Sequence, residues 1–343
     1  MRSLYMTGYL DDMTGYGQQN CRLIEGFQAN GIQVSCFPTG LSEKPRRISD
    51  NVRRTIVQTP QPHPELVIQP PSFRPYHKNV ERVWLVVWES TKLDQNWVKK
   101  IDQCSAVVTP CDWTATALSA CGVEAPIYKI PLFLPTPYSY VPPAERDVFV
   151  FGCSGHLSSQ APRKNLGAAV QAFLTAFPGD PDVRLHIKMG EQDYLELPDD
   201  RRIIATRGYL EPEAMKQWYC DLDVFVHPAK SEGWGFQPLQ AMALGRPVIA
   251  CKYSGLAEYF SWDSGYEINY GYQPCSEMYQ NMGHWAEPDV GHMAFLMRHA
   301  YQNRDEVKAK GGMAAQIASR FTLTRTLSSL IPVLQKHGVI IDA

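Results

Sequence analysis

Several features that mark other classes of protein are missing from this sequence. No two of its nine cysteines form a C-x-x-C pair, and their number is odd. Secreted frameworks favour even numbers, and metal sites favour tight spacing. No apolar run approaches the roughly 18–20 residues that span a bilayer, and no leader with a cleavage site is visible. These absences predict nine free thiols in a reducing cytoplasm, in a protein that is soluble or peripheral at the inner membrane surface.

An excess of charge of either sign is also missing. The chain has 33 Lys and Arg against 35 Asp and Glu, which gives a formal net charge of -2. This balance gives no electrostatic case for general nucleic-acid binding. The basic run 44–54 is compatible with contact to anionic lipid or to a nucleic-acid acceptor, although a solvated surface is the commoner explanation.

What the sequence does contain is an alternating α/β pattern, long enough for two domains. Its 343 residues are 44% apolar, which is ample for two buried cores. Strands are expected at 2–9, 32–37, 66–69, 82–88, 106–109, 127–130, 148–153, 183–189, 224–227 and 247–251. Helices are expected at 18–29, 96–104, 113–121, 165–177, 211–220 and 236–244, followed by a mostly helical tail. Such alternation indicates parallel sheets.

The segment 131–143 divides this series. It contains five prolines (P-L-F-L-P-T-P-Y-S-Y-V-P-P), which cannot continue a helix or a central strand. We therefore expect an N-terminal Rossmann-like domain at 1–143, a C-terminal Rossmann-like domain at 144–322, and a last helix within 323–343. The predicted fold class is α/β, with two doubly wound domains and a ligand cleft between them.

The most informative stretch is 228–250, P-A-K-S-E-G-W-G-F-Q-P-L-Q-A-M-A-L-G-R-P-V-I-A. It follows a predicted strand, carries Glu232 and two glycines in a loop, and opens a helix near Phe236. Glycines let a backbone approach a ligand closely, and the amides of a helix start favour an anion such as a diphosphate. Gln240 lies about one turn into that helix.

This stretch resembles the signature of retaining GT-B glycosyltransferases of the family 4 type, also called glycosyl transferases group 1. The family pattern is E-x7-E followed by A-x-A-x-G-x-P-V. Glu232 matches the first glutamate, which in the family faces the donor sugar. Gln240 stands where the second glutamate holds the donor ribose, so a neutral side chain replaces a charged one. The resemblance implies a GT-B fold, whose last helix commonly crosses back to the N-terminal domain.

The resemblance also implies roles for residues elsewhere. Lys164 matches the family's diphosphate-binding lysine, and Arg163 is expected to replace an arginine that the family often carries upstream, where this chain has Ser154. Two cations there suit a leaving group whose negative charge grows as the sugar bond breaks. The donor-binding set is Gly15, Gly17, Ser154, Gly233, Trp234, Gly235, Phe236, Gln240 and Glu258.

Two of these expectations rest on strand ends. Glu89 follows the strongest N-terminal strand in W-E-S, and it is expected either to touch a sugar or to anchor buried hydrogen bonds. Asp11 and Asp12 begin the loop that carries Gly15 and Gly17, and they are candidates for binding the acceptor or for capping the helix. Asp223, in a D-L-D sequence, is expected to be structural, and no metal or cofactor is expected.

The predicted function is transfer of a hexose-type sugar, with retention, from a UDP- or GDP-sugar to an unidentified acceptor hydroxyl. The acceptor could belong to a glycan, a lipid-linked glycan, a protein, a small molecule or a modified DNA base. The predicted catalytic group is Glu232, Lys164, Arg163 and Glu89. The rivals are a non-catalytic nucleotide-sugar binder and another GT-B activity, such as an epimerase or a phosphorylase. A dehydrogenase is disfavoured because the chain has no G-x-G-x-x-G fingerprint.

Overall fold

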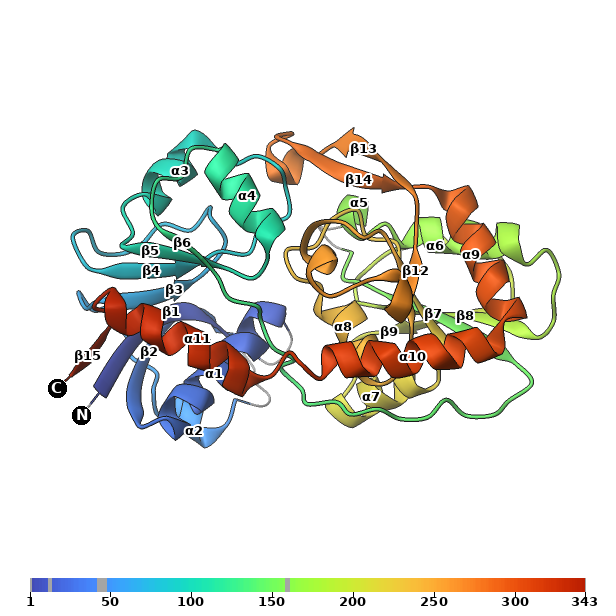
Figure 1. Cartoon of the computed structure of the whole chain (residues 1–343), viewed down its shortest axis with the longest axis horizontal. Helices are drawn as coiled ribbons and strands as arrows, with labels where there is room; N and C mark the ends of the chain where they lie inside the picture. The colour runs from blue at the N-terminus through green and yellow to red at the C-terminus, as the bar shows by residue number, and fades with distance from the viewer. Residues whose placement is uncertain (1, 12–13, 42–47, 158–160, 343) are drawn as a thin grey trace. The chain divides into compact units, whose positions relative to one another are not determined.

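The computed structural model describes residues 2–11, 14–41, 48–157 and 161–342. The chain divides into two compact units, drawn in Figure 1. Unit 1 comprises residues 1–88, 92–136 and 321–343, and unit 2 comprises residues 89–91 and 137–320. The short segment 89–91 thus belongs to unit 2, although the chain on both sides of it belongs to unit 1.

Unit 1 is built on a seven-stranded sheet. Its strands are β1 (Arg2–Leu10), β2 (Ile32–Leu41), β3 (Glu65–Ile68), β4 (Arg82–Leu85), β5 (Ala106–Thr109), β6 (Ile127–Lys129) and β15 (Ile340–Asp342). Its helices are α1 (Gly15–Ala29), α2 (Asp50–Arg53), α3 (Gln95–Ile101), α4 (Asp112–Ala120) and α11 (Leu323–Lys336). Every pairing is parallel except that of β15 with β1.

Helix α1 illustrates why these residues fold as they do. The side chain of Thr14 accepts a hydrogen bond from the Gly17 amide and so caps the first turn. Leu23, Ile24 and Phe27 form one fully buried face, as their spacing predicts. Figure 1 shows α11 along α1. Gly26 permits this packing, because a Cβ there would lie 2.6 Å from Leu327 Cδ1.

Unit 2 is built on a six-stranded parallel sheet in the order β12-β11-β10-β7-β8-β9. Its strands are β7 (Phe149–Ser154), β8 (Val183–Met189), β9 (Ile203–Arg207), β10 (Val224–His227), β11 (Val248–Ala250) and β12 (Gly265–Glu267), with a separate hairpin of β13 (Tyr270–Pro274) and β14 (His284–Pro288). Its helices are α5 (Ala161–Lys164), α6 (Leu166–Ala176), α7 (Pro212–Cys220), α8 (Phe236–Ala243), α9 (Val290–Gln302) and α10 (Arg304–Ala318). The strand order reverses between β7 and β10, which makes this pair the topological switch point.

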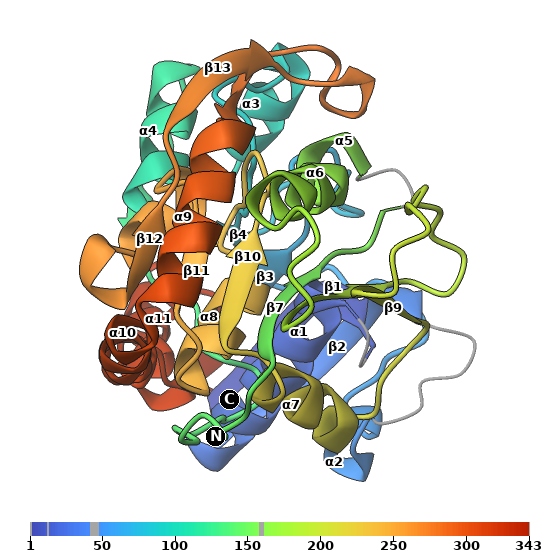
Figure 2. The same cartoon turned by 90° about the vertical axis from the view of Figure 1, so that its right-hand side faces the viewer.

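Helix α6 departs from its predicted start. Asn165 has a φ of +53°, in the left-handed region, and so separates α5 from α6. Arg163 and Lys164 therefore lie at the end of their own short helix α5, directly before the long helix that was predicted at 165–177. Helix α6 buries Leu166 and Phe173 as predicted. Figure 2 shows α6 beside α9.

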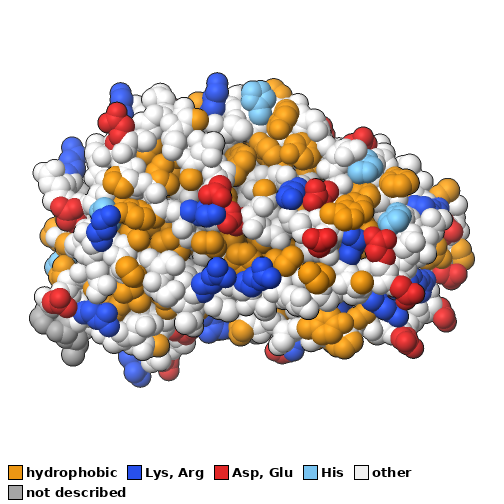
Figure 3. All heavy atoms as spheres, in the orientation of Figure 1, with side chains coloured by type: hydrophobic (Ala, Val, Ile, Leu, Met, Phe, Trp, Pro, Cys, Tyr) orange, Lys and Arg blue, Asp and Glu red, His pale blue; other side chains and the backbone are white. Residues whose placement is uncertain are grey.

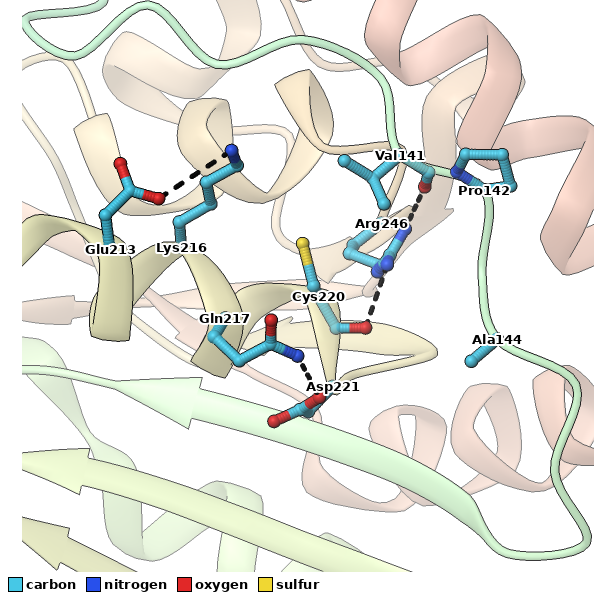
Figure 4. A pocket seen from close by; sticks show the side chains of 9 residues that line it. All are labelled: Val141, Pro142, Ala144, Glu213, Lys216, Gln217, Cys220, Asp221 and Arg246. Atoms are coloured by element: carbon cyan, nitrogen blue, oxygen red, sulfur yellow. Dashed lines mark hydrogen bonds and ion pairs between the residues drawn. The ribbon is translucent and has the colours of Figure 1, made fainter.

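A cavity of about 370 Å³ lies at the edge of unit 2 from which β10 and β11 start, away from their carboxyl ends. Figure 4 shows its lining: Val141, Pro142, Ala144, Glu213, Lys216, Gln217, Cys220, Asp221 and Arg246. None of the predicted site residues lines it. Arg246 is almost fully buried and donates hydrogen bonds to the main-chain oxygens of Val141, Leu244, Tyr219 and Cys220. The guanidinium therefore holds the end of the proline-rich stretch, at Val141, against the C-terminal ends of α7 and α8.

Replacing this arginine should destabilise unit 2. Arg246→Met would leave four carbonyl oxygens without their donor, and we expect it to lower the free energy of unfolding by about 3 kcal/mol. Urea unfolding measures the change. Arg304→Met is the matched control, because the exposed Arg304 also donates to two main-chain oxygens, those of Arg146 and Asp147, a few residues further along the chain. Equal effects of the two variants would contradict the assignment to Arg246.

On the face shown in Figure 3, basic and acidic side chains are interspersed. None of the helices in the described part of the chain combines the length and apolar character needed to cross a bilayer. The nine cysteines, all within described residues, form no disulfide.

Candidate functional site

The switch point of unit 2 brings two distant segments together. Strands β7 and β10 pair in parallel, with Val224 opposite Phe151, so their carboxyl ends lie at one edge of the sheet. The chain after β7 leads into α5, which ends in Arg163 and Lys164. The chain after β10 carries Ser231 and Glu232. Ligands of open α/β sheets bind in such a crevice.

Glu232 lies at the centre of this edge. Its side chain is buried, and both carboxylate oxygens are engaged by cations from α5. Lys164 Nζ lies 2.6 Å from Oε1, and Arg163 Nη1 lies 3.0 Å from Oε2. Arg163 Nη1 also donates to the Ser231 oxygen at 2.6 Å. The structure thus brings three of the four predicted catalytic residues into direct contact.

These contacts decide the charge of each group. Burial opposes ionisation of Glu232, but Lys164 and Arg163 outweigh it and hold the pKa of the carboxyl well below its usual range. Burial lowers the pKa of Lys164, against the attraction of Glu232. The site therefore holds a carboxylate shared by two buried cations, and a further anion would find positive charge already in place.

His227, which the sequence suggested only as a strand end, belongs to this cluster. It ends β10, is almost fully buried, and its Nε2 lies 3.4 Å from Glu232 Oε1. Burial lowers its pKa, so the neutral imidazole is favoured. Its position at the carboxyl end of a central strand next to the motif was the signal that could have found it.

The loop after Glu232 is held by the 3₁₀ helix η2 (Ser254–Glu258). The main-chain amide of Glu232 donates to Ser254 Oγ at 2.9 Å, and the Gly255 amide donates to the main-chain oxygen of Glu232 at 2.8 Å. Gly235 has a φ of +88°, and a Cβ there would lie 2.6 Å from Leu256 Cδ1. Glycine is therefore required where α8 begins, and the amides of Gly233 and Phe236 lie around this turn.

Some predicted donor residues take structural positions. The Trp234 side chain is buried against Tyr259, with ring centroids 5.3 Å apart, so its main chain is the part that a donor could reach. Ser154 is buried at the end of β7, and Glu258 is half-buried in η2. Gln240 Oε1 accepts a hydrogen bond from the Tyr219 hydroxyl at 3.2 Å.

Glu89 joins the same cluster. It lies in unit 2, is half-buried, and its Oε2 accepts a hydrogen bond from the Tyr279 hydroxyl at 3.1 Å. Burial raises the pKa of Glu89, and the nearby Arg163 opposes this rise. Tyr279 was missed by the sequence reasoning, because 190 residues separate it from Glu89 along the chain.

Gly15 and Gly17 lie in unit 1, at the start of α1. Gly17 approaches Asp11 so closely that a Cβ would lie 2.6 Å from the Asp11 oxygen. The Asp11 carboxylate accepts hydrogen bonds from the amide and the hydroxyl of Thr14. It therefore stabilises the loop, which is the capping alternative, whereas Asp12 lies outside the described residues.

Asp223, the second aspartate of the D-x-D sequence before β10, has a structural role, as predicted. Asp223 Oδ2 accepts a hydrogen bond from the Val150 amide at 2.7 Å and lies 3.3 Å from Arg146 Nη2. Across the residues that the structure describes, no three His, Cys, Asp or Glu side chains form a group that could hold a metal.

Comparison with known proteins assigns the segment that contains this geometry. Residues 148–271 match the family described as Glycosyl transferases group 1. This match covers about a third of the chain and contains the whole motif from Glu232 to Gln240. The family resemblance drawn from the E-x7-E-like motif is therefore confirmed for this segment.

Two curated relatives match shorter stretches of the chain. The uncharacterized glycosyltransferase 335 of Sulfolobus islandicus rod-shaped virus 1 is 28% identical over 113 residues, which is 32% of this chain and 34% of that protein. The lipopolysaccharide core biosynthesis mannosyltransferase LpsB of Rhizobium meliloti is 49% identical over 41 residues, 12% of each chain. The chain thus spans about a third of the first relative's length and about an eighth of the second's.

Two solved structures match the chain over nearly its full length. Sucrose-phosphate synthase from Thermosynechococcus elongatus has a TM-score of 0.68 at 13% identity, covering 98% of this chain and 99% of that one. Anabaena Alr3699/HepE, solved with UDP and glucose, has a TM-score of 0.64 at 14% identity, covering 97% and 100%. These likenesses confirm the predicted GT-B fold, with two sheets that are parallel except for β15.

Proposed function

We propose that this protein is a retaining glycosyltransferase that moves a hexose-type sugar from a UDP- or GDP-sugar to an acceptor hydroxyl. One observation carries the proposal: Arg163 and Lys164 meet Glu232 within 3.0 Å at the carboxyl edge of β7 and β10. Positive charge, a glycine-shaped turn and a helix start then share one edge of the sheet. This combination suits a nucleotide diphosphate that carries a sugar.

Each residue has a role in this proposal. Lys164, Arg163 and the amides of Gly233–Phe236 bind the diphosphate and stabilise the charge that develops as it leaves. The cations are already desolvated, so little rearrangement of solvent accompanies the reaction. Glu232 accepts hydrogen bonds from sugar hydroxyls once the diphosphate takes over part of its contact with Lys164. Glu89 accepts a hydrogen bond from a further sugar hydroxyl, from a different direction than Glu232.

The proposed chemistry is front-face displacement with retention. The bond between the anomeric carbon and the leaving phosphate oxygen breaks while the bond to the acceptor oxygen forms on the same face. The proton of the acceptor hydroxyl passes to the departing diphosphate, whose charge Lys164 and Arg163 stabilise. No covalent nucleophile is invoked, and both engaged oxygens of Glu232 suit orientation rather than attack.

The nucleotide half of the donor is assigned to the neighbourhood of Gln240. Its side-chain oxygen already accepts from Tyr219, and its amide nitrogen offers donors to ribose hydroxyl oxygens. A glutamate would offer only acceptors there. We therefore expect weaker ribose binding than a charged residue would give, without loss of the fold.

A thermal-shift and hydrolysis screen against UDP-, GDP-, ADP- and dTDP-sugars tests the proposal. UDP-glucose is the first donor to try, because Alr3699/HepE was solved with UDP and glucose. We expect one donor class to raise the melting temperature by mass action and to be hydrolysed slowly without an acceptor. A protein that responds to no nucleotide sugar would overturn the donor site.

A non-catalytic nucleotide-sugar binder is the second candidate, and Gln240 in place of the second motif glutamate favours it. It predicts the same stabilisation by a donor but neither hydrolysis nor transfer to any acceptor. The proposal further includes a cytoplasmic location, which the reduced cysteines support. The acceptor is proposed only as a hydroxyl-bearing glycan, lipid-linked glycan, protein, small molecule or modified DNA base.

A further inference from the structure

A β-hairpin interrupts unit 2 between β12 and α9. Strands β13 and β14 pair antiparallel from Tyr270 opposite Pro288 to Pro274 opposite His284. The connection between them contains the 3₁₀ helix η4 (Glu277–Tyr279). We call residues 270–288 the hairpin segment. All but its first two residues lie beyond the group 1 family match at 148–271.

One side of the hairpin segment is fastened to the motif loop. The Ala286 amide donates to the Lys230 oxygen at 3.1 Å, and Lys230 Nζ lies 2.6 Å from Glu287 Oε2. Lys230 stands two residues before Glu232. The Tyr253 hydroxyl, next to η2, donates to the His284 oxygen at 3.4 Å. These contacts therefore fix the position of the hairpin segment relative to the loop that carries Glu232.

The same hairpin segment holds each of residues 89–91 by hydrogen bonds. Trp285 Nε1 donates to the main-chain oxygen of Glu89 at 2.7 Å, and Ser90 Oγ donates to the main-chain oxygen of Met282 at 2.6 Å. The His284 amide donates to Thr91 Oγ1 at 2.9 Å. Main chain and side chain of this tripeptide are both constrained, so its position is set by the hairpin segment.

Tyr279 adds the contact to the Glu89 carboxylate. Its side chain is almost fully buried and packs edge-on against Trp285, with centroids 5.1 Å apart. Gln280 and Asn281, which follow it, have φ values of +55° and +54°. Two successive left-handed residues without glycine are strained, and such strain persists only where the surroundings enforce it. The Tyr279 hydroxyl donates to Oε2 of Glu89 at 3.1 Å.

We propose that the hairpin segment is a positioning device for Glu89, with Tyr279 as its positioning residue. The inference rests on the proposed function, because Glu89 is taken to bind a sugar hydroxyl. Oε2 of Glu89 is engaged by Tyr279. We infer that Oε1 accepts a hydrogen bond from a hydroxyl group, either of the donor sugar or of the acceptor molecule, beside Arg163. The segment thereby couples the geometry of the Glu232 loop to that of Glu89.

A double-mutant cycle tests this assignment. Tyr279→Phe is measured in the wild-type background and in the Glu89→Ala background, using the sugar nucleotide that the donor screen selects. We expect Tyr279→Phe to lower kcat about tenfold in the wild type, the scale of one hydrogen bond to a charged group, and less than twofold in Glu89→Ala. KM and the Kd for the nucleoside diphosphate of that donor should stay within about twofold of wild type.

Tyr272→Phe is the matched control, because Tyr272 lies on the same hairpin and is 68% exposed. It should leave kcat unchanged. An equal fall of kcat for Tyr279→Phe in both backgrounds would assign Tyr279 a general structural role and overturn the proposal. Weaker binding of that nucleoside diphosphate with unchanged kcat would do the same, because it would place Tyr279 at the nucleotide.

A second readout separates this inference from the proposed function. The same four proteins are compared by melting temperature without any ligand. Tyr279→Phe should lower the melting temperature of the wild type and have a much smaller effect in Glu89→Ala, because the partner is already gone. If no sugar nucleotide binds or reacts, the proposed function fails. Additive shifts in melting temperature for the two substitutions would instead show that Tyr279 does not hold Glu89.

Discussion

Lys164→Ala should abolish most turnover while leaving a folded protein. Lys164 Nζ is buried 2.6 Å from Glu232 Oε1, at the edge where the leaving diphosphate is proposed to bind. Losing one preorganised charge at a developing anion lowers kcat by about 100- to 1,000-fold. Folding should suffer less, because Glu232 keeps Arg163 as a partner at 3.0 Å. Donor hydrolysis and melting temperature together measure the two effects.

Lys252→Ala is the control for charge alone. Lys252 follows β11 in the same unit and forms a more exposed ion pair with Glu267 at 3.6 Å. Exposed pairs contribute little to stability, and this lysine has no role in the proposed site, so turnover should match wild type. Wild-type turnover in Lys164→Ala would exclude Lys164 from the reaction, whereas parallel losses in both variants would point to net charge.

The switch point could be predicted because its parts are local in sequence. The glycine-bearing loop from Glu232 to Phe236 follows a short apolar strand and opens a helix, which together predict a strand–loop–helix turn. Arg163 and Lys164 follow another strand. Parallel strands place their carboxyl ends at one edge, so both sets were expected at one site. The strand order that makes β7 and β10 direct neighbours required the structure.

The ion pairs themselves were not predictable. Glu232 was expected at a loop tip, open to sugar hydroxyls, yet it is buried between Lys164 and Arg163. Sixty-eight residues separate Lys164 from Glu232, and no pattern in the sequence specifies such a pairing. The sequence does not reveal that these three side chains are buried. Buried cations without a counterion are costly, so the Glu232 carboxylate lies between Lys164 and Arg163.

The hairpin segment was missed for a different reason. Its strands Y-G-Y-Q-P and H-W-A-E-P each end in proline and contain few β-branched residues, so neither reads as a strand. The edge strand β9 was missed as well, since it is short and mostly exposed. The consequence was larger for the hairpin, because it carries Tyr279 and Trp285, the partners that fix Glu89.

Glu232→Gln should be the most destabilising single change in the site. The carboxylate is shared by Lys164, Arg163 and, at 3.4 Å, His227. A neutral amide would leave two buried cations without their counterion, which we expect to lower the free energy of unfolding by about 3 kcal/mol or more at pH 7. Lys164→Ala should have a smaller effect, since it removes one of those cations. Urea unfolding at pH 7 ranks the two variants.

The pH dependence distinguishes charge from shape. The folded pKa of Glu232 is depressed, so its stabilising contribution is fully present above the unfolded pKa of about 4.3 and is lost as pH falls toward the folded value. Wild type and Glu232→Gln should therefore differ by a constant amount between pH 7 and about 5, and converge below about 4.3. A difference that persists unchanged at lower pH would mean that the amide disturbs packing. Convergence would assign the stabilisation to the charge that holds Lys164 and Arg163 in place for a diphosphate.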